Sequence, residues 1–178
     1  MAHRVDFFTV HPATFRRLYV FLVLSLERRR IVHFNVTANP TAAWTGLQLI
    51  QAFPFDSAPQ YLIRDRDGVY DQAVVDSLET MGIDQILTAP RSPWQNGCCE
   101  RVIGTIRREC LDHVVALGYK HLRRVLKEYM AYYHESRTHL GLGKDTPELR
   151  AIQSPDVGAV ECEPALGGLH HRYFRKAA

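Results

Sequence analysis

Residues 4–36 read RVDFFTVHPATFRRLYVFLVLSLERRRIVHFNV and contain three apolar segments with polar residues between them. The segments 4–10, 18–26 and 31–36 are short and rich in β-branched and aromatic residues, a composition typical of β-strands. The arginine run at 28–30 separates the last two segments and marks the tip of a hairpin. The sequence therefore predicts three consecutive strands near the start of the chain.

Strands and helices alternate after this first block. Asn39 followed by Pro40 is an N-cap and first-turn signal, which predicts a helix over 40–52. The pattern of apolar residues then predicts strands over 61–64 and 84–89 and helices over 71–82, 95–110 and 122–135. Three strands followed by alternating helices and strands indicate an α/β fold, with a mixed five-stranded sheet flanked by helices.

The composition is that of a globular protein with one main domain. The chain has 178 residues, of which 46% are hydrophobic, and a net charge of +3. Its apolar runs are shorter than the roughly 20 residues that span a bilayer, and Asp6 interrupts the first one where a signal peptide would be apolar. We expect a cytosolic protein with no membrane partner. We also expect a core domain over 1–142 and a loosely organised tail over 143–178, with a short strand near 169–174.

A belt of basic residues follows Glu100. Between Arg101 and Arg124 the acidic residues are Glu109 and Asp112, whereas the basic ones are Arg101, Arg107, Arg108, Lys120, Arg123 and Arg124. Such a belt suits the phosphate backbone of a nucleic acid. A solvated helical surface would carry the same charges, so the belt alone does not establish nucleic-acid binding.

Three carboxylates from distant segments are candidates for one site. Asp6 lies among aromatic residues in the first strand, where a carboxylate is costly unless it is at an edge, paired or bound to a cation. Asp65 follows an apolar strand, whose carboxyl end is a natural rim for a site. Glu100 lies about one turn into a helix, with Gly104 and Arg107 on the same face. Carboxylate oxygens can hold hard divalent cations, although 19 acidic residues also produce such triplets by chance.

Two adjacent cysteines, Cys98 and Cys99, come just before Glu100. An apolar stripe at helical spacing runs through Cys99, Ile103, Ile106 and Cys110. Cys98 lies roughly 100° away around the helix, which disfavours a disulfide with its neighbour. We therefore expect the cysteines to be packing residues and Glu100 to carry the chemistry.

Four motifs carry a resemblance to a known family. They are VDFFTV at 5–10, YLIRDRDGVY at 61–70, APRSPWQNGCCERVIGTIRREC at 89–110 and YYHESRTHLGL at 132–142. The chain resembles the catalytic core of retroviral-type integrases, and more closely the bacterial insertion-sequence transposases that share an acidic (DDE) triad. The motif at 89–110 is the most specific of the four. The resemblance implies a ribonuclease H-like fold.

The resemblance also implies which residues form the triad. It places the three carboxylates on Asp6, Asp65 and Glu100, and the separation of the last two is within the range that the family uses. Asp67 competes with Asp65 for the second position. The family has an aromatic residue at a fixed distance after this aspartate, and Tyr70 stands at that distance from Asp65, so we choose Asp65.

The activity that the resemblance implies is metal-dependent polynucleotidyl transfer in DNA integration or transposition. Water would cleave a phosphodiester at a transposon end, and the freed 3′-hydroxyl would attack target DNA. The triad would hold Mg²⁺ or Mn²⁺, as two ions. The partners would be transposon-end and target DNA, together with at least one further copy of the chain. Residues expected to contact DNA are Gln95, Asn96, Gly97, Arg101, Gly104, Arg107, Arg108, Lys120, Arg123 and Arg124.

Gln95, Asn96 and Gly97 also have a purely structural explanation. Asn96 is a good N-cap for the helix that carries Glu100, and Gly97 allows close backbone approach. A capping role and a place in the DNA-contacting loop are compatible, and both remain open at this point.

Two other hypotheses compete with strand transfer. Transposases of this kind usually carry DNA-binding segments ahead of the core, whereas Asp6 stands almost at the start of this sequence. The chain would then be a core-only product, half of a split element, or an inactive or truncated core that only binds nucleic acid or a partner transposase. The third hypothesis is a nuclease acting on RNA–DNA hybrids, which the motif at 89–110 disfavours. If the protein is bacterial, both the active transferase and the inactive DNA-binding core would associate with the nucleoid.

Overall fold

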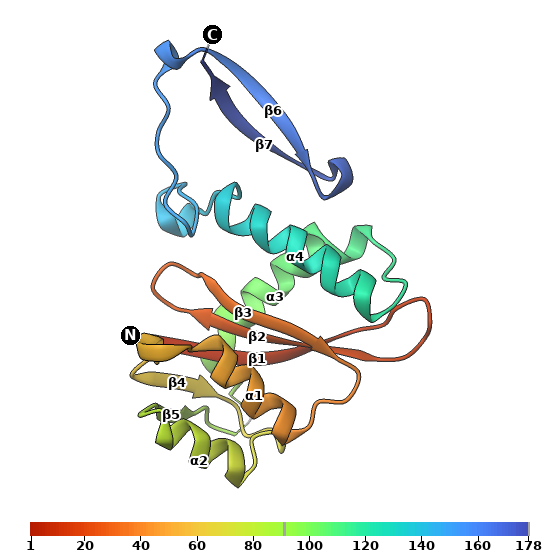
Figure 1. The fold of residues 1–178 in the computed structure, drawn as a ribbon, viewed down its shortest axis with the longest axis vertical. Helices are drawn as coiled ribbons and strands as arrows, with labels where there is room; N and C mark the ends of the chain where they lie inside the picture. Colours follow the sequence, from red (N-terminus) through yellow and green to blue (C-terminus); the bar gives the residue numbers. More distant parts are fainter. Residues whose placement is uncertain (91, 178) are drawn as a thin grey trace. The chain divides into compact units, whose positions relative to one another are not determined.

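A mixed five-stranded sheet organises the first part of the chain (Figure 1). The computed structural model describes residues 1–90 and 92–177, which form two compact units, Met1–Leu122 and Arg123–Ala178. The sheet has the order β3-β2-β1-β4-β5. Its strands are β1 (Ala2–Val10), β2 (Leu18–Ser25), β3 (Ile31–Thr37), β4 (Tyr61–Arg64) and β5 (Asp84–Leu87). β1, β2 and β3 pair antiparallel, whereas β4 pairs parallel with both β1 and β5, so the predicted mixed five-stranded sheet is confirmed.

The long apolar run in β2 reflects burial on both faces of the sheet. Phe21 and Val23 point to one face, Leu22 and Leu24 point to the other, and each of the four is at most 1% exposed. A strand buried on both sides reads as a continuous apolar segment, without the alternation of a half-exposed strand. The arginine run at 28–30 lies at the connection to β3, where the sequence predicted a hairpin tip.

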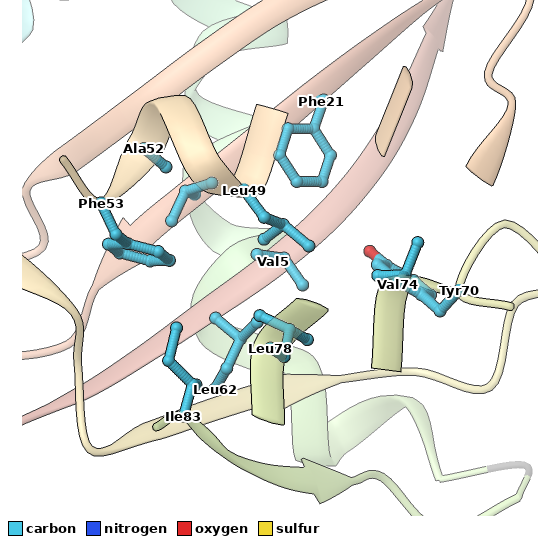
Figure 2. Packing of buried hydrophobic residues seen from close by; sticks show 11 residues of the cluster. Val5, Phe21, Leu49, Ala52, Phe53, Leu62, Tyr70, Val74, Leu78 and Ile83 are labelled. Carbon is cyan, nitrogen blue, oxygen red and sulfur yellow. The ribbon is translucent and has the colours of Figure 1, made fainter. Parts of the chain in front are cut away.

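Two helices, α1 (Ala42–Ala52) and α2 (Gln72–Thr80), cover one face of this sheet. Figure 2 shows the resulting core, in which Val5 and Phe21 from the sheet pack with Leu49 of α1 and Leu78 of α2. Gln48 of α1 is also buried, and its side-chain oxygen accepts a hydrogen bond of 2.8 Å from Asn35 of β3. These contacts fix the helices against the sheet from which the site residues project.

The predicted cap of α1 is wrong. The Asn39–Pro40 signal placed the start of the helix at residue 40, whereas α1 begins at Ala42 and is capped by Thr41, whose hydroxyl accepts from the backbone N–H of Trp44 at 3.2 Å. The backbone N–H of Asn39 donates to the Thr37 hydroxyl at 3.1 Å. Asn39 therefore belongs to the turn that ends β3, and Thr41 takes the capping role.

The third helix, α3 (Gly97–Glu109), lies on the opposite face of the sheet and follows the short helix η2 (Pro93–Asn96) (Figure 1). The predicted apolar stripe is buried: Cys99, Ile106 and Cys110 are fully covered, and Ile103 is 9% exposed. This burial orients α3 so that Glu100, which neighbours Cys99, is exposed on another side of the helix. The prediction that Cys99 faces the core is confirmed.

The fourth helix, α4 (Tyr119–Glu135), passes from the first unit into the second. Its predicted apolar face is confirmed by the burial of Leu122, Val125, Leu126, Tyr129 and Tyr133. The exposed positions include Lys120, Arg123 and Arg124. Within the part of the chain that the structure describes, no helix has the length and apolar character needed to cross a membrane.

The second unit ends in an antiparallel hairpin of β6 (Ala159–Ala165) and β7 (His170–Lys176). The sequence suggested one short strand near 169–174 in a loosely organised tail, and the structure pairs that strand with a second one. The hairpin is tied to the end of α4, since His170 stacks on Tyr132 at 4.4 Å and Arg172 lies 3.6 Å from Glu135. The remaining short helices are η1 (Phe55–Ser57), η3 (Leu111–His113), η4 (Leu140–Leu142), η5 (Pro155–Val157) and η6 (Leu166–Gly168).

Candidate active site

Two of the three candidate carboxylates project from neighbouring parallel strands. The last paired positions of β1 and β4 are Arg4 and Ile63, and Asp6 and Asp65 each stand two residues beyond that pair. Equivalent register positions on adjacent parallel strands lie side by side, so Asp6 within β1 lies next to Asp65, which directly follows the end of β4. The register of β1 and β4 is therefore what brings residues from distant segments together.

One cleft of about 370 Å³ contains all three candidate carboxylates. Glu100 reaches it from the first turn of α3, and Thr88, Ala89, Pro90 and Ser92 line another side. Its lining residues are Asp6, Asp65, Arg66, Thr88, Ala89, Pro90, Ser92, Asn96 and Glu100. The structure thus places the three residues inferred from the family resemblance around a shared opening, which a phosphate group of a polynucleotide can enter.

Asp6 is held by two hydrogen bonds at the floor of this cleft. Its Oδ1 accepts from the backbone N–H of Phe7 at 2.7 Å, and its Oδ2 accepts from Nδ2 of Asn96 at 2.6 Å. Asn96 stands at the predicted N-cap position of α3, but its side chain makes no capping hydrogen bond. The predicted capping role of this side chain is therefore wrong, because the amide is used to hold Asp6.

The surroundings of Asp6 disfavour its negative charge. Burial, with a further contribution from the charges of Asp65 and Glu100, raises the pKa of this carboxyl from its ordinary value of 3.8 to about 6, although the two hydrogen bonds act in the opposite direction. A carboxylate in this environment is stabilised by a nearby cation, which offsets both the lost hydration and the repulsion. The electrostatics of the cleft therefore favour a bound positive charge.

Arg4 fixes the loop that holds Asn96. Its guanidinium donates to the backbone carbonyl of Gln95 and lies 3.4 Å from Oδ1 of Asn96. Gln95 is fixed on its other side, since its Oε1 accepts from the backbone N–H of Ala89 at 2.7 Å. Arg4 was not among the site residues predicted from the sequence. The signal was its position two residues before Asp6, because alternate residues of a strand share one face.

The loop after β4 distinguishes Asp65 from Asp67. β4 ends at Arg64, so the two aspartates lie in a turn in which Oδ1 of Asp65 accepts from the backbone N–H of Asp67 at 3.1 Å. Oδ1 of Asp67 accepts in turn from the backbone N–H of Val69 at 3.0 Å. Asp65 lines the cleft, whereas Asp67 is not among its lining residues as described. This arrangement supports the choice of Asp65 as the second carboxylate.

The basic residues of α3 have different surroundings. Arg101 is exposed, while Arg107 donates to the Thr9 carbonyl at 3.0 Å and lies over the Phe8 ring at 5.5 Å. Nη1 of Arg108 would be 3.0 Å from a Cβ placed on Gly104. The space left by the missing side chain of Gly104 is thus partly occupied by the Arg108 guanidinium.

The other residues predicted to contact DNA lie in both units. Gly97 begins α3 and has open space around its missing Cβ. Lys120 is exposed in the first unit, and Arg123 and Arg124 are exposed in the second. The structure therefore brings Asn96, Asp6, Asp65 and Glu100 to one cleft and leaves the cations of the belt available at the surface.

The carboxylate oxygens of the cleft are suitable ligands for a hard divalent cation. They are not positioned to coordinate one ion together. Three carboxylates supply the oxygen ligands that Mg²⁺ and Mn²⁺ prefer. Among the described residues, no group of three or more His, Cys, Asp or Glu side chains is set closely enough to hold a metal ion as placed. Coordination of one ion by all three would require side-chain movements, which the exposed positions of Asp65 and Glu100 allow.

The two cysteines beside Glu100 have opposite environments. Cys98 is an exposed thiol, whereas Cys99 is fully buried. Burial raises the pKa of the Cys99 thiol, and the charge of Asp6 raises it further. A thiol kept protonated in an apolar setting is a poor nucleophile. Cys99 is therefore unsuited to act as a nucleophile.

Comparison with known proteins agrees with the resemblance seen in the sequence. Residues 81–147 match the family model described as integrase core domain. No curated protein matches the sequence. Among solved structures, the HTLV-2 integrase catalytic core domain in complex with magnesium superposes with a TM-score of 0.66 at 13% identity, over 82% of this chain and 92% of that one. The catalytic domain of Mos1 mariner transposase superposes with a TM-score of 0.62 at 16% identity, over 73% of this chain and 69% of that one.

A larger assembly provides a third match. A chain of a simian T-cell lymphotropic virus intasome superposes with a TM-score of 0.65 at 13% identity. The alignment covers 97% of this chain but only 65% of that one, so this chain spans less than two thirds of that relative. At such identities the matches establish the fold, which is the ribonuclease H-like fold of integrase and transposase catalytic cores.

Proposed function

Because the segment 81–147 matches the integrase core domain and the fold is that of integrase and transposase catalytic cores, we propose that this chain is a metal-dependent polynucleotidyl transferase. In this proposal it cleaves a phosphodiester at a DNA end and joins the freed 3′-hydroxyl to a target strand. Asp6, Asp65 and Glu100 are the catalytic and metal-binding residues. The biological process is DNA integration or transposition.

The observation that carries this proposal is the shared cleft of the three carboxylates. Asp6, Asp65 and Glu100 come from β1, the end of β4 and α3, and they line one opening. Burial is the main cause of the raised pKa of Asp6, and the charges of Asp65 and Glu100 add to it. Mutual repulsion of this kind disfavours the folded state, so a site that retains it is consistent with cation binding.

Mg²⁺ or Mn²⁺, as a pair of ions, would lower the pKa of the attacking group and neutralise charge on the reacting phosphate. The HTLV-2 core was solved in complex with magnesium, which supports this choice of cation. Asp6 and Asp65 would share one or both ions, and Glu100 would complete the coordination of one. The chain itself keeps Asp6 in place through Asn96, so that its carboxylate needs little reorganisation when an ion binds.

The basic residues have a positioning role in the proposal. Arg101, Arg107 and Arg108 on α3, with Lys120 in the same unit, would contact phosphates on the DNA that enters the cleft. Arg123 and Arg124, which belong to the second unit, would also contact DNA phosphates. Phosphate contacts fix the register of DNA without reading its sequence. Gln95, Asn96, Gly97 and Gly104 would allow the DNA backbone to approach the α3 segment closely.

The proposed partners are DNA ends, target DNA and further copies of the chain. The intasome match and the dimeric and trimeric forms of the HTLV-2 core describe assemblies of those proteins. Joining two ends to one target requires two active sites, so we propose that the working unit is at least a dimer. Sedimentation of the protein with and without DNA would measure this.

Plasmid nicking and strand joining test the activity. The purified chain, Mn²⁺, a supercoiled plasmid and a labelled duplex oligonucleotide should give nicked plasmid and labelled joined product. Asp6→Asn, Asp65→Asn and Glu100→Gln should each reduce both products by at least about 100-fold, because each removes a ligand or charge that the transition state needs. Asp67→Asn is the matched control from the same turn as Asp65.

Three results would count against the proposal. Full activity of the Glu100→Gln variant would remove Glu100 from the triad. If Asp67→Asn loses activity and Asp65→Asn retains it, the second catalytic carboxylate is Asp67 and not Asp65. Duplex binding by a wild-type protein that neither nicks nor joins DNA would instead support a core that only binds nucleic acid. Circular dichroism of every variant checks that the fold is retained.

A further inference from the structure

The loop between β1 and β2 has an aromatic and basic surface that the proposed active site does not use. It covers residues 11–17, HPATFRR, and begins directly after the strand that carries Asp6. Phe15 in this loop is 91% exposed and has a φ of 58°. A large side chain in the left-handed region is strained, and an exposed ring gains nothing from burial. The chain thus maintains this ring in solvent at a cost to stability.

An open pocket of about 590 Å³ lies at this loop. Its described lining residues are His11, Phe15, Arg16, Arg17, Tyr19 and Ala38. This set combines two arginines and a histidine with two aromatic rings, and it includes no carboxylate. Nucleic acids offer the matching chemistry, since phosphates pair with arginine and the flat faces of bases stack on aromatic rings.

Hydrogen bonds hold the loop in a defined place. The backbone N–H of Ala13 donates to the carbonyl of Ala116 at 2.7 Å, and that of Phe15 donates to the carbonyl of Pro12 at 2.9 Å. The first of these bonds fastens the loop to the segment that leads into Lys120. At the other end of the loop, Arg107 donates to the carbonyl of Thr9.

The loop is therefore continuous with the proposed DNA surface. Arg107 and Lys120 belong to the basic belt, and the loop is tied to the chain beside each of them. Val115 and Leu117, which flank the hydrogen-bonded Ala116, are 70% and 64% exposed. Exposed apolar groups beside cations suit the sugar and base surfaces of DNA as well as its phosphates. The surface carries a net positive charge, which an acidic polymer complements.

We propose that the loop 11–17 is a second DNA contact of this core, an inference that rests on the proposed function. Phe15 inserts between two bases of the duplex and stacks on the face of one, and Arg16 and Arg17 contact neighbouring phosphates. Along β1 the distance from Asp6 to Val10 is about 13 Å, given the rise of a strand. For DNA that runs along β1, about 3.4 Å per base pair places the start of the loop about four base pairs from the phosphodiester at the cleft.

Binding of a fluorescent 30-base-pair duplex to the full chain in EDTA tests this contact without catalysis. Phe15→Ala should weaken binding by about 5- to 150-fold, the range seen for removal of one stacking side chain. Phe15→Asn is a second variant that removes the ring but tolerates the left-handed backbone, so a folding defect can be recognised. Arg16→Ser/Arg17→Ser should reduce the slope of log affinity against log salt by about 1.8, since two phosphate contacts are lost.

Phe55→Ala is the matched control for the ring. Phe55 is 99% exposed and has a φ of 54°, but it lies in the segment FPFDSAPQ, which has no basic residue. Its removal should leave duplex affinity unchanged. In a nicked duplex with 2-aminopurine at successive positions, the fluorescence change that depends on Phe15 should occur about four base pairs from the nick.

The outcomes separate this inference from the proposed function. The loop contact is overturned if the loop variants bind duplex DNA with the same affinity and the same salt slope as the wild type and Phe55→Ala. This result would not affect the proposed roles of Asp6, Asp65 and Glu100. A wild-type chain that binds no duplex at all overturns both proposals. Loop variants that keep DNA affinity but lose binding to an acidic protein would assign the loop to a protein partner, which also overturns the contact with DNA.

Discussion

Asn96 and Asp6 are 90 residues apart in the sequence, and the side-chain amide of Asn96 donates a hydrogen bond of 2.6 Å to Oδ2 of Asp6. This bond joins the segment that begins α3 to the strand at the centre of the cleft. It also gives Asn96 a specific task, since the amide orients the carboxylate that has the most strongly buried charge of the triad. Residues that orient a ligand in this way reduce the reorganisation needed when the site is filled.

Replacement of Asn96 by alanine should change the titration of Asp6. The hydrogen bond from Asn96 lowers the pKa of this carboxyl, so its loss should raise the pKa above the value of about 6 in the metal-free protein. A bond to a charged group corresponds to about one pKa unit. Carbon-13 NMR of labelled aspartate carboxyls measures the shift. Asn39→Ala is the control, and an Asp6 titration that is the same in both variants would contradict the role assigned to Asn96.

The stability of the metal-free protein should fall as pH rises from about 4 to about 7. Asp6 has a pKa of about 6 in the folded chain against an ordinary value of 3.8, so in this window the folded state binds a proton that the unfolded state releases. The free energy of unfolding then decreases with pH, by about 3 kcal/mol in total from this group. In Asp6→Asn this part of the slope should be absent.

Urea unfolding at pH 4 and pH 7, with EDTA present, measures this difference. Asp67→Asn removes the same charge from the turn after β4 and is the control. Saturating Mn²⁺ at pH 7 should raise the stability of the wild type but not that of Asp6→Asn, because ligand binding to the folded state stabilises it. Equal pH slopes in the wild type and Asp6→Asn would show that Asp6 is not in the environment described.

Gly104→Ala should stabilise the protein and weaken DNA binding. Alanine in a helix interior is favoured over glycine by up to about 1 kcal/mol, and the new Cβ would meet only the flexible Arg108 guanidinium, at 3.0 Å. That guanidinium must then move, which should lower duplex affinity several-fold. Urea unfolding and fluorescence anisotropy measure the two effects. Gly118→Ala, at a position with open space, is the control. Unchanged DNA affinity would remove Gly104 from the DNA surface.

The adjacent cysteines should differ sharply in reactivity. A maleimide should modify Cys98 rapidly in the folded protein, whereas Cys99 should react only after unfolding, because it is fully buried. Mass spectrometry of peptides after timed labelling distinguishes the two thiols. Cys98→Ser should retain plasmid nicking, since the proposed chemistry uses carboxylates. If this variant keeps its fold but loses nicking, the Cys98 thiol takes part in the reaction, contrary to the proposal.

Periodicity predicted the elements that build the cleft. The β-branched and aromatic composition of β1, the apolar run of β2 and the stripe through Cys99 and Ile106 each reflect which faces are buried, and burial leaves a local pattern in the sequence. The hydrogen bonds that organise the cleft were not predictable in this way. Arg4 and Asn96 are brought together by the packing of α3 against β1, and no local pattern encodes the partner of a side chain.

The same limit explains the two helix caps that were predicted wrongly. Asn39 and Asn96 are both good capping residues by type, yet the Thr37 hydroxyl holds the backbone of the first and Asp6 accepts from the side chain of the second. The paired strand β6 was also missed, because it is exposed along its length and lacks the alternation of a half-buried strand.

The metal-binding role of the three carboxylates is tested most directly by anomalous diffraction from a crystal soaked in Mn²⁺. The account predicts an anomalous peak in the cleft, bound by carboxylate oxygens of Asp6 and Asp65 at about 2.2 Å, with Glu100 turned toward the same site or a second ion beside it. The peak should disappear in Asp6→Asn crystals soaked in the same way. Manganese bound through Asp67, or a soaked crystal with an empty cleft and manganese elsewhere, would contradict the account.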